Sequence, residues 1–253
     1  MPGGDWNFIN DHLGGWDDDG MPNFMSKPHF FDYRPPIKTG VSGNRTDKEN
    51  YESGALKSEK RYYQHRLMHS IEYFENGNRK EYISYSNNKD NVSAHKIGSI
   101  TNYYENGNKK FNASYDLLGN FSQINWWYKN GKLSTKNDFT RHLETNYAEN
   151  GMKSSEGRFV FASEEFKKDG KWTFWVTNPD NEHYQEWYTE NYINDKLEGK
   201  FCRYDKHGNL TEQGNYKDNM MHGKWLQYDE NGQIIKDYFF KKDKLIVKNP
   251  AYE

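Results

Sequence analysis

The sequence is poor in cysteine and in long apolar runs, and both absences limit what the protein can be. Its 253 residues include a single cysteine, Cys202, so neither a disulfide within the chain nor a cysteine-based zinc site can form. No apolar run approaches the roughly 20 residues that a membrane-spanning helix needs. The acidic segment 1–20 lacks the basic start and apolar stretch of a secretory signal. We therefore expect an intracellular protein, in the cytoplasm or in a mitochondrion.

An excess of positive charge is also missing. The formal net charge is −2, and charges of both signs alternate along the chain, which is typical of a solvated surface. A nucleic-acid-binding protein would need a basic excess or a basic stripe, so we expect no nucleic-acid partner. We expect membrane contact only through partner proteins.

Aliphatic residues are scarce, but aromatic residues are abundant. Hydrophobic residues make up 33% of the chain and aromatic residues 17%. Disordered chains are poor in aromatics, whereas each ring can bury roughly 150–250 Å². The composition predicts a thin folded structure with half-exposed rings rather than one thick aliphatic core.

An internal repeat is the main signal in the chain. The segment 192–210 aligns with the segment 216–234. The matching pairs are Tyr192 and Tyr216, Gly199 and Gly223, Phe201 and Trp225, Tyr204 and Tyr228, Gly208 and Gly232, and Leu210 and Ile234.

The same frame extends upstream as a series of Asn-Gly pairs. They occur at Asn76-Gly77, Asn106-Gly107, Asn130-Gly131, Asn150-Gly151 and Asn231-Gly232, with His207-Gly208 in the same place. An aromatic residue precedes each glycine by four positions: Tyr73, Tyr103, Trp127, Tyr147, Tyr204 and Tyr228. Asn-Gly between strand-like runs favours a type I′ hairpin turn, with positive φ at both central residues. The flanking aromatics suit half-buried strands.

A second glycine precedes Lys and a ring in three repeats, at Gly170, Gly199 and Gly223. Because glycine lacks a side chain, we expect these positions to let one hairpin approach the next closely. No segment of useful length shows a helical period. Stacked hairpins would then form a long twisted antiparallel sheet.

The pattern Y-x6-G-K-W/F-x2-Y-x3-G resembles the MORN repeat, and more closely its variant form with an ENG turn. The resemblance covers residues 51–245 and implies an all-β fold, an elongated antiparallel sheet of stacked MORN-type β-hairpin repeats. It also implies a scaffold or a protein-binding surface, and in some members a lipid-binding surface or an antitoxin. The array is irregular, because Gly77 and Gly107 are more widely spaced than Gly131 and Gly151. This irregularity indicates specialised loops.

The N-terminal segment 1–50 differs in composition from the rest. It holds most of the seven prolines and many aromatic residues, which a flexible linker would lack. We predict an extended arm at residues 1–50 and a repeat domain at 51–253. The arm residues expected to bind a partner, or the protein's own sheet, are Trp6, Phe8, Trp16, Phe24, Phe30, Phe31 and Tyr33.

Motifs that carry chemistry are weak. The acidic run Asp17–Asp19 lacks the spacing and the closing Glu of a calcium loop, and His65 and His69 lack the Glu of a zinc-protease motif. Trp126 lies outside the repeat frame and is a candidate stacking platform on the surface. We predict no catalytic, cofactor-binding or metal-binding residues, and no enzyme.

The sequence favours a non-catalytic scaffold that binds other protein subunits, as an accessory or structural subunit of a larger complex. A repeat sheet offers a long binding surface, and an aromatic arm suits wrapping around a partner. The Asn-, Lys- and Tyr-rich composition is typical of an AT-rich genome, so an organellar complex of a protist is one hypothesis. The alternatives are a bacterial antitoxin or immunity protein that neutralises one effector, and a peripheral lipid-binding module.

Overall fold

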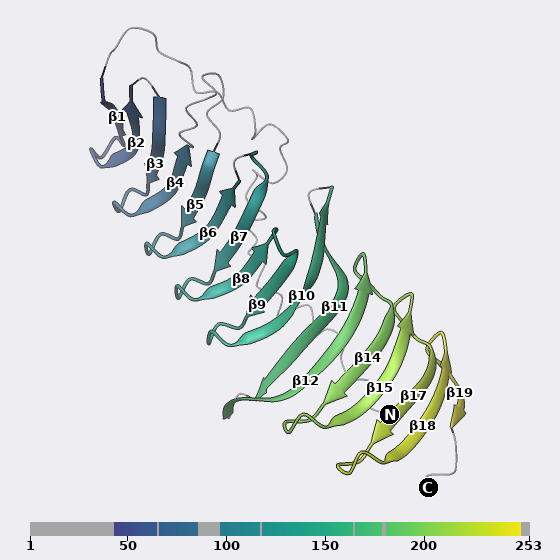
Figure 1. The fold of residues 1–253 in the computed structure, drawn as a ribbon. Coiled ribbons are helices and arrows are strands. Elements are labelled where there is room, and N and C mark those ends of the chain that lie inside the picture. Colours follow the sequence, from purple (N-terminus) through teal and green to yellow (C-terminus); the bar gives the residue numbers. More distant parts are fainter. Residues whose placement is uncertain are drawn as a thin grey trace. The chain divides into compact units, whose positions relative to one another are not determined.

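The computed structural model describes residues 43–64, 66–85, 97–116, 118–163, 165–178 and 181–248 (Figure 1). Within these ranges the chain forms strands and turns and no helix, and every strand pairing is antiparallel. The described chain divides into two compact units. Unit 1 runs to Arg141 and includes Ala148–Gly151, and unit 2 comprises His142–Tyr147 and the chain from Met152 onward.

Unit 1 is a ladder of eight strands in which each strand pairs with the next along the chain. The strands are β1 (Arg45–Asn50), β2 (Leu56–Tyr63), β3 (Arg66–Tyr73), β4 (Arg79–Tyr85), β5 (Ile97–Tyr103), β6 (Lys109–Tyr115), β7 (Phe121–Trp127) and β8 (Leu133–Asp138). Its most buried apolar side chains are Ile100, Phe111, Ala113 and Ile124, each at most 1% exposed.

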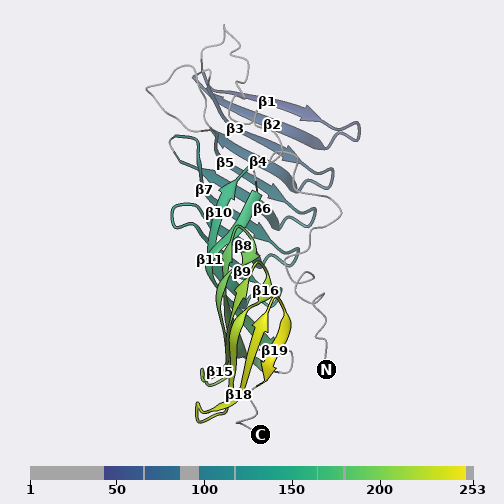
Figure 2. The same ribbon diagram turned by 90° about the vertical axis from the view of Figure 1, so that its right-hand side faces the viewer.

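Unit 2 continues the hairpin pattern from β9 to β19. Its strands are β9 (Leu143–Tyr147), β10 (Lys153–Ala162), β11 (Glu165–Asn178), β12 (Asn181–Ile193), β13 (Lys196–Leu197), β14 (Gly199–Tyr204), β15 (Leu210–Lys217), β16 (Met220–Met221), β17 (Gly223–Tyr228), β18 (Ile234–Lys241) and β19 (Lys244–Lys248). The short strand β13 pairs with β12 next to the turn, and β14 continues the pairing with β12. In the same way β16 and then β17 pair with β15. Figures 1 and 2 show each unit as hairpins laid side by side.

The predicted fold class, an antiparallel sheet of stacked β-hairpin repeats, is therefore confirmed in both units. The sheet begins at Arg45, because β1 pairs with β2 from Arg45–Tyr62 to Asn50–Leu56. The last residues of the segment assigned to the arm thus form the first strand. The remainder of the arm, residues 1–42, lies outside the described residues.

The prediction of type I′ turns at the Asn-Gly pairs is wrong. At the first pair, the Gly77 N–H donates to the Phe74 carbonyl (2.9 Å), and the Phe74 N–H donates to the Asn78 carbonyl (2.8 Å). Gly77 has φ +87°, whereas Asn76 is not among the residues with positive φ. This is a type I turn closed by a left-handed glycine, the three-residue hairpin loop with a bulge. The residues Glu-Asn-Gly fit it because only the last position needs glycine.

Two-residue turns with positive φ do occur, but at the opposite ends of the hairpins in unit 2. The pairs are Asn194-Asp195 (φ 49° and 67°), Asp218-Asn219 (50° and 66°) and Lys242-Asp243 (51° and 59°). Asn and Asp tolerate the left-handed region better than other non-glycine residues. The sequence contained this signal, but without glycine it did not stand out.

The glycines that precede Lys and a ring also have a different role from the one predicted. Gly199 and Gly223 adopt φ +96° and +76°, and a Cβ at Gly223 would meet nothing within 4 Å. They are therefore required by backbone conformation and not by close approach. The close approaches occur at Gly157 and Gly214, where a Cβ would lie 2.3 Å from Trp172 and 2.1 Å from Trp225.

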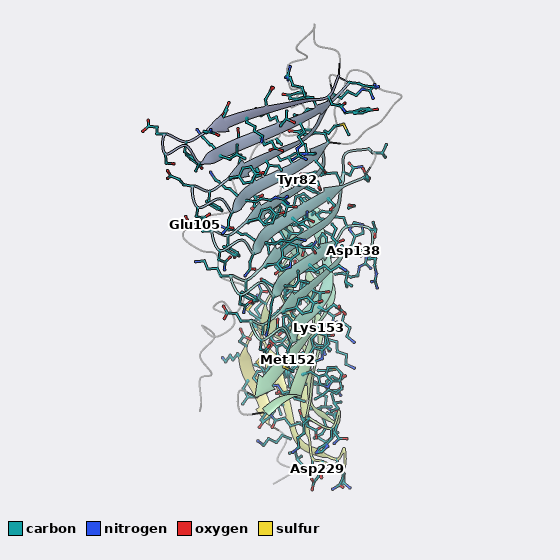
Figure 3. The ribbon with its side chains drawn as sticks, turned by 90° about the vertical axis from the view of Figure 1, so that its left-hand side faces the viewer. Tyr82, Glu105, Asp138, Met152, Lys153 and Asp229 are labelled. Atoms are coloured by element: carbon teal, nitrogen blue, oxygen red, sulfur yellow. The ribbon has the colours of Figure 1, made fainter. Side chains whose placement is uncertain are left out.

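Side chains at the turns tie neighbouring hairpins together in unit 1. The Glu105 carbonyl accepts from Asn76 (3.1 Å) and Asn78 (2.7 Å), and Glu105 is labelled at the turn end of its hairpin in Figure 3. The Lys129 carbonyl accepts in the same way from Asn106 (2.9 Å) and Asn108 (2.8 Å). These bonds join turns whose spacing in sequence differs, so the irregular repeat length does not disturb the stack.

In unit 2 the ties lie at the other ends, in the type I′ turns. The Asp195 side chain accepts from the Lys168 N–H (2.7 Å), and the Asp195 N–H donates back to the Lys168 carbonyl (2.9 Å). Asn219 makes the same reciprocal pair with Leu197, at 2.7 and 3.0 Å. Each carboxylate or amide thus replaces a backbone carbonyl and extends the ladder by one step.

Candidate binding surface

One face of unit 2, the core face, is built from a line of aromatic rings at equivalent repeat positions. Trp172, Phe201 and Trp225 are 1%, 4% and 4% exposed and stand on β11, β14 and β17. Phe201 and Trp225 are stacked with their centroids 5.3 Å apart, and Tyr216 meets the Trp225 ring edge-on at 5.3 Å. Gly214 leaves room for the Trp225 indole. The rings thus form the interior of unit 2.

A polar cluster interrupts this ring line. The Lys168 Nζ lies 4.9 Å from the ring centroids of Trp172, Phe174 and Tyr192. Burial is the largest cause that lowers the pKa of Lys168, and burial likewise raises the pKa of Glu190, which is 8% exposed. The Tyr192 hydroxyl donates a hydrogen bond to the Glu190 carboxylate.

The cluster is where this repeat departs from its successors. Lys168 stands two positions before the repeat glycine, where the next repeats have Leu197 and Met221. Glu190 occupies the repeat position that Gly214 holds in the following repeat. Because the cation is surrounded by rings and Glu190 is buried, the cluster belongs to the interior of unit 2 and offers a macromolecule little surface.

The opposite face of unit 2 exposes a row of polar and apolar side chains, which we call the lysine row. Cross-strand pairing sets Lys171 opposite Asn191, Lys200 opposite Asn215, Lys224 opposite Phe239 and Phe239 opposite Val247. Alternate strands thus contribute the exposed lysines Lys171, Lys200 and Lys224. Lys224 forms an ion pair with Asp237 at 3.1 Å. At the far end Phe239 and Val247 are 48% and 53% exposed.

An aromatic row, formed by Trp175, Trp187, Tyr204 and Tyr228, lies on the same face as the lysine row. Trp175 pairs across the strands with Trp187, and Trp187 with Tyr204. The Trp187 and Tyr204 rings are stacked, with centroids 3.8 Å apart and an interplanar angle of 9°. All four rings are half-buried.

Smaller side chains fill the strip between the two rows. Cys202 is 4% exposed and is one of these small packed residues. The Lys153 Nζ lies 5.3 Å from the Trp175 ring and 2.9 Å from the Glu156 carboxylate, and Lys153 is labelled in Figure 3. Together the lysine row and the aromatic row form the lysine face, which combines exposed positive charge with flat rings. Arg and Lys over rings and rings at a surface are features of binding sites.

Unit 1 presents a polar face whose side chains bond to one another. Ser84 and Ser99 share a hydrogen bond of 2.8 Å across β4 and β5. Asn112 donates to the Thr101 hydroxyl at 3.0 Å. These mutual bonds use up donors and acceptors that a partner would otherwise meet, so the face is less suited to binding than the lysine face.

Trp126, the predicted stacking platform, lies on the other face of unit 1, with the aliphatic core. It pairs across the strands with Phe111 and Thr135, and its ring meets Phe111 edge-on at 5.3 Å. The side chain is half-buried. Binding at Trp126 stays a prediction. The arm residues Trp6, Phe8, Trp16, Phe24, Phe30, Phe31 and Tyr33, and the acidic run Asp17–Asp19, lie outside the described residues.

Within the described ranges, no three or more His, Cys, Asp or Glu side chains gather in a way that could hold a metal ion. His69 is described and its ring lies 5.7 Å from the Tyr82 ring, whereas His65 is not described. Among the same residues no helix has the length and apolarity to cross a membrane.

The fold defines a repeat protein of stacked antiparallel hairpins. A model of the MORN repeat variant matches residues 197–218 and 221–242. The chain therefore carries MORN-variant repeats in unit 2, and the predicted family is confirmed. MORN repeats are generally protein- or lipid-binding modules.

No curated protein matches the chain. Among solved structures, the crystal structure of TcdB2-TccC3 is 13% identical with a TM-score of 0.21, and the match covers 82% of this chain and 12% of that one. The Photorhabdus luminescens Tc holotoxin pore is 10% identical over 79% of this chain and 12% of that one, with a TM-score of 0.17. A Bacteroides fragilis protein of unknown function is 11% identical over 79% of this chain and 96% of that one, with a TM-score of 0.10. This chain thus spans about an eighth of the two toxin structures, and TM-scores this low carry no argument about function.

Proposed function

We propose that the protein is a non-catalytic accessory or structural subunit that binds another protein through the lysine face of unit 2. The observation that carries this proposal is the pairing of exposed Lys171, Lys200 and Lys224 with the stacked rings of Trp187 and Tyr204 on one face. Aromatic residues are enriched in the cores of protein interfaces, and charges at their rims guide association.

The chemistry of this face indicates the kind of partner. Three exposed lysines on alternate strands favour a partner surface with carboxylates, and the half-buried rings favour apolar side chains beside them. The exposed Phe239 and Val247 extend the apolar part to the edge strand β19. The arm rings from Trp6 to Tyr33 supply a second contact in this proposal, one that wraps the partner.

The test starts from native isolation. The tagged full-length protein would be purified from its own cells under mild conditions, sized, and its companions identified by mass spectrometry. We expect a stoichiometric protein companion in a complex well above the 30.2 kDa of the chain. A 30.2 kDa monomer, free of companions in every growth condition tried, would contradict the proposal.

A matched pair of variants tests whether the companion binds to the lysine face. One variant carries Lys171→Glu, Lys200→Glu and Lys224→Glu; the control carries Lys60→Glu, Lys80→Glu and Lys129→Glu, which reverse three exposed lysines of unit 1. We expect the first variant to lose the companion and the control to keep it, since both change the net charge equally. Equal retention by both variants would place the interface elsewhere.

A further inference from the structure

Four Asn-Gly pairs stand in the same backbone loop. In each loop the glycine N–H donates to the carbonyl three residues before it, and a second backbone bond closes the loop, with all these distances between 2.8 and 3.0 Å. Each glycine has positive φ, and each asparagine is exposed. The pairs are Asn76-Gly77, Asn106-Gly107, Asn130-Gly131 and Asn231-Gly232. Neither the backbone nor exposure therefore distinguishes them, and a difference in reactivity must come from the contacts of the asparagine side chains.

In unit 1 each of these side-chain amides is held at both ends. The Asn76 Oδ1 accepts from the Asn78 N–H (2.9 Å), and the Asn76 Nδ2 donates to the Glu105 carbonyl (3.1 Å). The equivalent two bonds are 3.0 and 2.9 Å for Asn106, and 2.9 and 3.1 Å for Asn130. The carbonyl carbon of each amide is thus fixed in one orientation by its own loop and by the next one.

In the loop between β17 and β18 of unit 2, Asp229 takes over the donor that holds the asparagine elsewhere. The Asp229 carboxylate, labelled at this loop in Figure 3, accepts from the N–H groups of Asn231 (2.9 Å) and Gln233 (2.8 Å). The Asn231 Oδ1 thus loses the donor that its counterparts use. The next turn, Lys242-Asp243, lies at the opposite end of its hairpin, so it offers the Asn231 Nδ2 no carbonyl. Within the described part of the chain, the Asn231 side chain makes no hydrogen bond.

An asparagine that precedes a glycine is open to an intramolecular reaction. The glycine nitrogen attacks the side-chain carbonyl carbon, a C–N bond forms, and the amide nitrogen leaves as ammonia after taking up the proton of the glycine N–H. Water then opens the resulting succinimide at either carbonyl and yields aspartate or isoaspartate. Glycine favours the attack because no side chain hinders its nitrogen. The amide must rotate toward that nitrogen, so hydrogen bonds that fix the amide slow the reaction.

We propose that Asn231-Gly232 is a modification site of this protein, at which the asparagine is converted to aspartate and isoaspartate without an enzyme. The same loops that join the hairpins of unit 1 protect Asn76, Asn106 and Asn130 from this reaction. The inference goes beyond the proposed function and does not depend on it, because it concerns the reactivity of the chain itself.

The conversion changes both the charge and the backbone of the loop. A new carboxylate at position 231 stands next to the carboxylates of Asp229 and Glu230. In the isoaspartate product the main chain passes through the side-chain carbon and is longer by one atom. The lengthened backbone no longer fits the bond between the Gly232 N–H and the Asp229 carbonyl (3.0 Å), so this end of the hairpin loosens.

The first experiment compares the asparagines within one sample of the folded full-length protein. The protein would be incubated in H₂¹⁸O at neutral pH and digested in ordinary water, so that only conversions during the incubation carry the heavy oxygen. Mass spectrometry of the peptides measures the conversion at each position. We expect conversion at Asn231 to be at least about tenfold faster than at Asn76 and Asn106, because two hydrogen bonds must break there before the amide can rotate.

Equal conversion at the three positions, or faster conversion at Asn76 or Asn106 than at Asn231, would overturn the proposal. So would an Asn231 that stays intact for as long as the two asparagines of unit 1, since the unbonded amide would then not be the reactive one.

The unfolded chain supplies a matched control. Asn76, Asn106 and Asn231 all stand in the tripeptide Glu-Asn-Gly, so their nearest neighbours in sequence are the same. In concentrated guanidinium chloride the loops are lost, and we expect the three rates to converge. A preference for Asn231 that persisted in the unfolded chain would come from the local sequence and would overturn the structural explanation.

Two substitutions at Asp229 test the cause of the difference. Asp229→Tyr introduces the residue type found at this loop position in Tyr104 and Tyr128, and it frees the Gln233 N–H to hold the Asn231 Oδ1. We expect conversion at Asn231 to become several-fold slower. Asp229→Asn keeps an oxygen that can accept from Gln233, so its rate should stay close to that of the wild type. A rate that is unchanged or faster in Asp229→Tyr would overturn the proposal.

Discussion

Unit 1 and unit 2 build the same hairpin array from different core residues. In unit 1 the centre of the core face holds Ile100, Ala113 and Ile124, which pair across neighbouring strands. In unit 2 the corresponding line holds Trp172 and Trp225, each seated against a glycine. The comparison shows that the hairpin stack can be built on either an aliphatic or an aromatic core.

The two units also differ in how their hairpins are tied at the edges. Unit 1 uses asparagine side chains that donate to the carbonyl of the next turn, as Asn108 does to Lys129. Unit 2 uses side chains that accept from a strand, as Asp195 does from Lys168. The repeat-variant model matches only within unit 2. The matched residues include Phe201, Gly214 and Trp225 of the ring core.

The largest expected effect is on the ring core of unit 2. Trp172→Ala removes a side chain that is 1% exposed, so we expect a loss of about 3–5 kcal/mol in the free energy of unfolding. Denaturant unfolding would measure the loss, and hydrogen exchange would localise it to β10, β11 and β12. Because repeats interact mainly with their neighbours, β2–β6 of unit 1 should keep their protection. Equal loss of protection in β2–β6 would contradict the separation into two units.

A substitution at Gly214 tests whether the Trp225 ring lies close against the backbone of β15. Gly214→Ala places a Cβ 2.1 Å from the Trp225 indole, so the ring must move, at a cost of about 1–3 kcal/mol. The same change in a Trp225→Leu background should cost less, because the smaller side chain leaves room. Thermal unfolding of the four proteins in this cycle measures the coupling. Equal costs in both backgrounds would show that the indole is not the obstacle.

Removing one of the asparagine hydrogen bonds that join neighbouring turns of unit 1 should reduce the free energy of unfolding by a smaller amount. Asn108→Ala removes the 2.8 Å bond to the Lys129 carbonyl, and we expect a loss of about 0.5–1.5 kcal/mol. The control is Asn215→Ala at an exposed strand position of unit 2, where we expect a change within about 0.5 kcal/mol. Denaturant unfolding of both variants makes the comparison. A larger loss from Asn215→Ala would show that the asparagine hydrogen bonds between the turns do not stabilise unit 1.

The smallest effect concerns pH and the cluster inside unit 2. Burial raises the pKa of Glu190 above its usual 4.5, so the folded state holds this proton more tightly than the unfolded state does. The free energy of unfolding should therefore fall as pH rises from 4.5 through the raised pKa of the folded state. Glu190→Gln should remove this fall. Tyr192→Phe, which deletes a hydrogen bond that lowers the pKa, should extend the fall to higher pH. An unchanged pH profile in Glu190→Gln would assign the slope to another group.

The sequence was sufficient to predict the hairpin repeat, its frame and the family, because Tyr192, Gly199 and Phe201 recur with fixed spacing. It also located the repeat glycines. The turn type at the Asn-Gly pairs was predicted wrongly, since Asn-Gly suits both a type I′ turn and the longer loop that ends in a left-handed glycine. The glycines before Lys and a ring were assigned to close packing, whereas Gly199 and Gly223 are required by their positive φ. The two glycines that do make room for rings, Gly157 and Gly214, have no motif around them. Only the register of the strands brings them against Trp172 and Trp225.

The candidate binding surface could be predicted only in part. The lysines of the Gly-Lys-Trp/Phe element were visible in the sequence, as were the rings at the turn positions. Their placement on one face could not be assigned, because bulges such as the one between Arg203 and Tyr204 shift the alternation of side chains. The cluster of Lys168 and Glu190 was missed because the two residues stand on different strands, far apart in sequence. A position-by-position comparison of this repeat with the next ones would have singled out Lys168 and Glu190, because the next repeats have Leu197 and Gly214 at these positions.

Hydrogen exchange on the native complex, compared with the free protein, tests the central claim most directly. The account predicts added protection on partner binding in β11, β12, β14 and β17, which carry the lysine row and the stacked Trp187 and Tyr204. It predicts unchanged exchange in the polar face of unit 1, from β4 to β7. Protection confined to β4–β7, with unit 2 unchanged, would contradict the account and move the binding surface to unit 1.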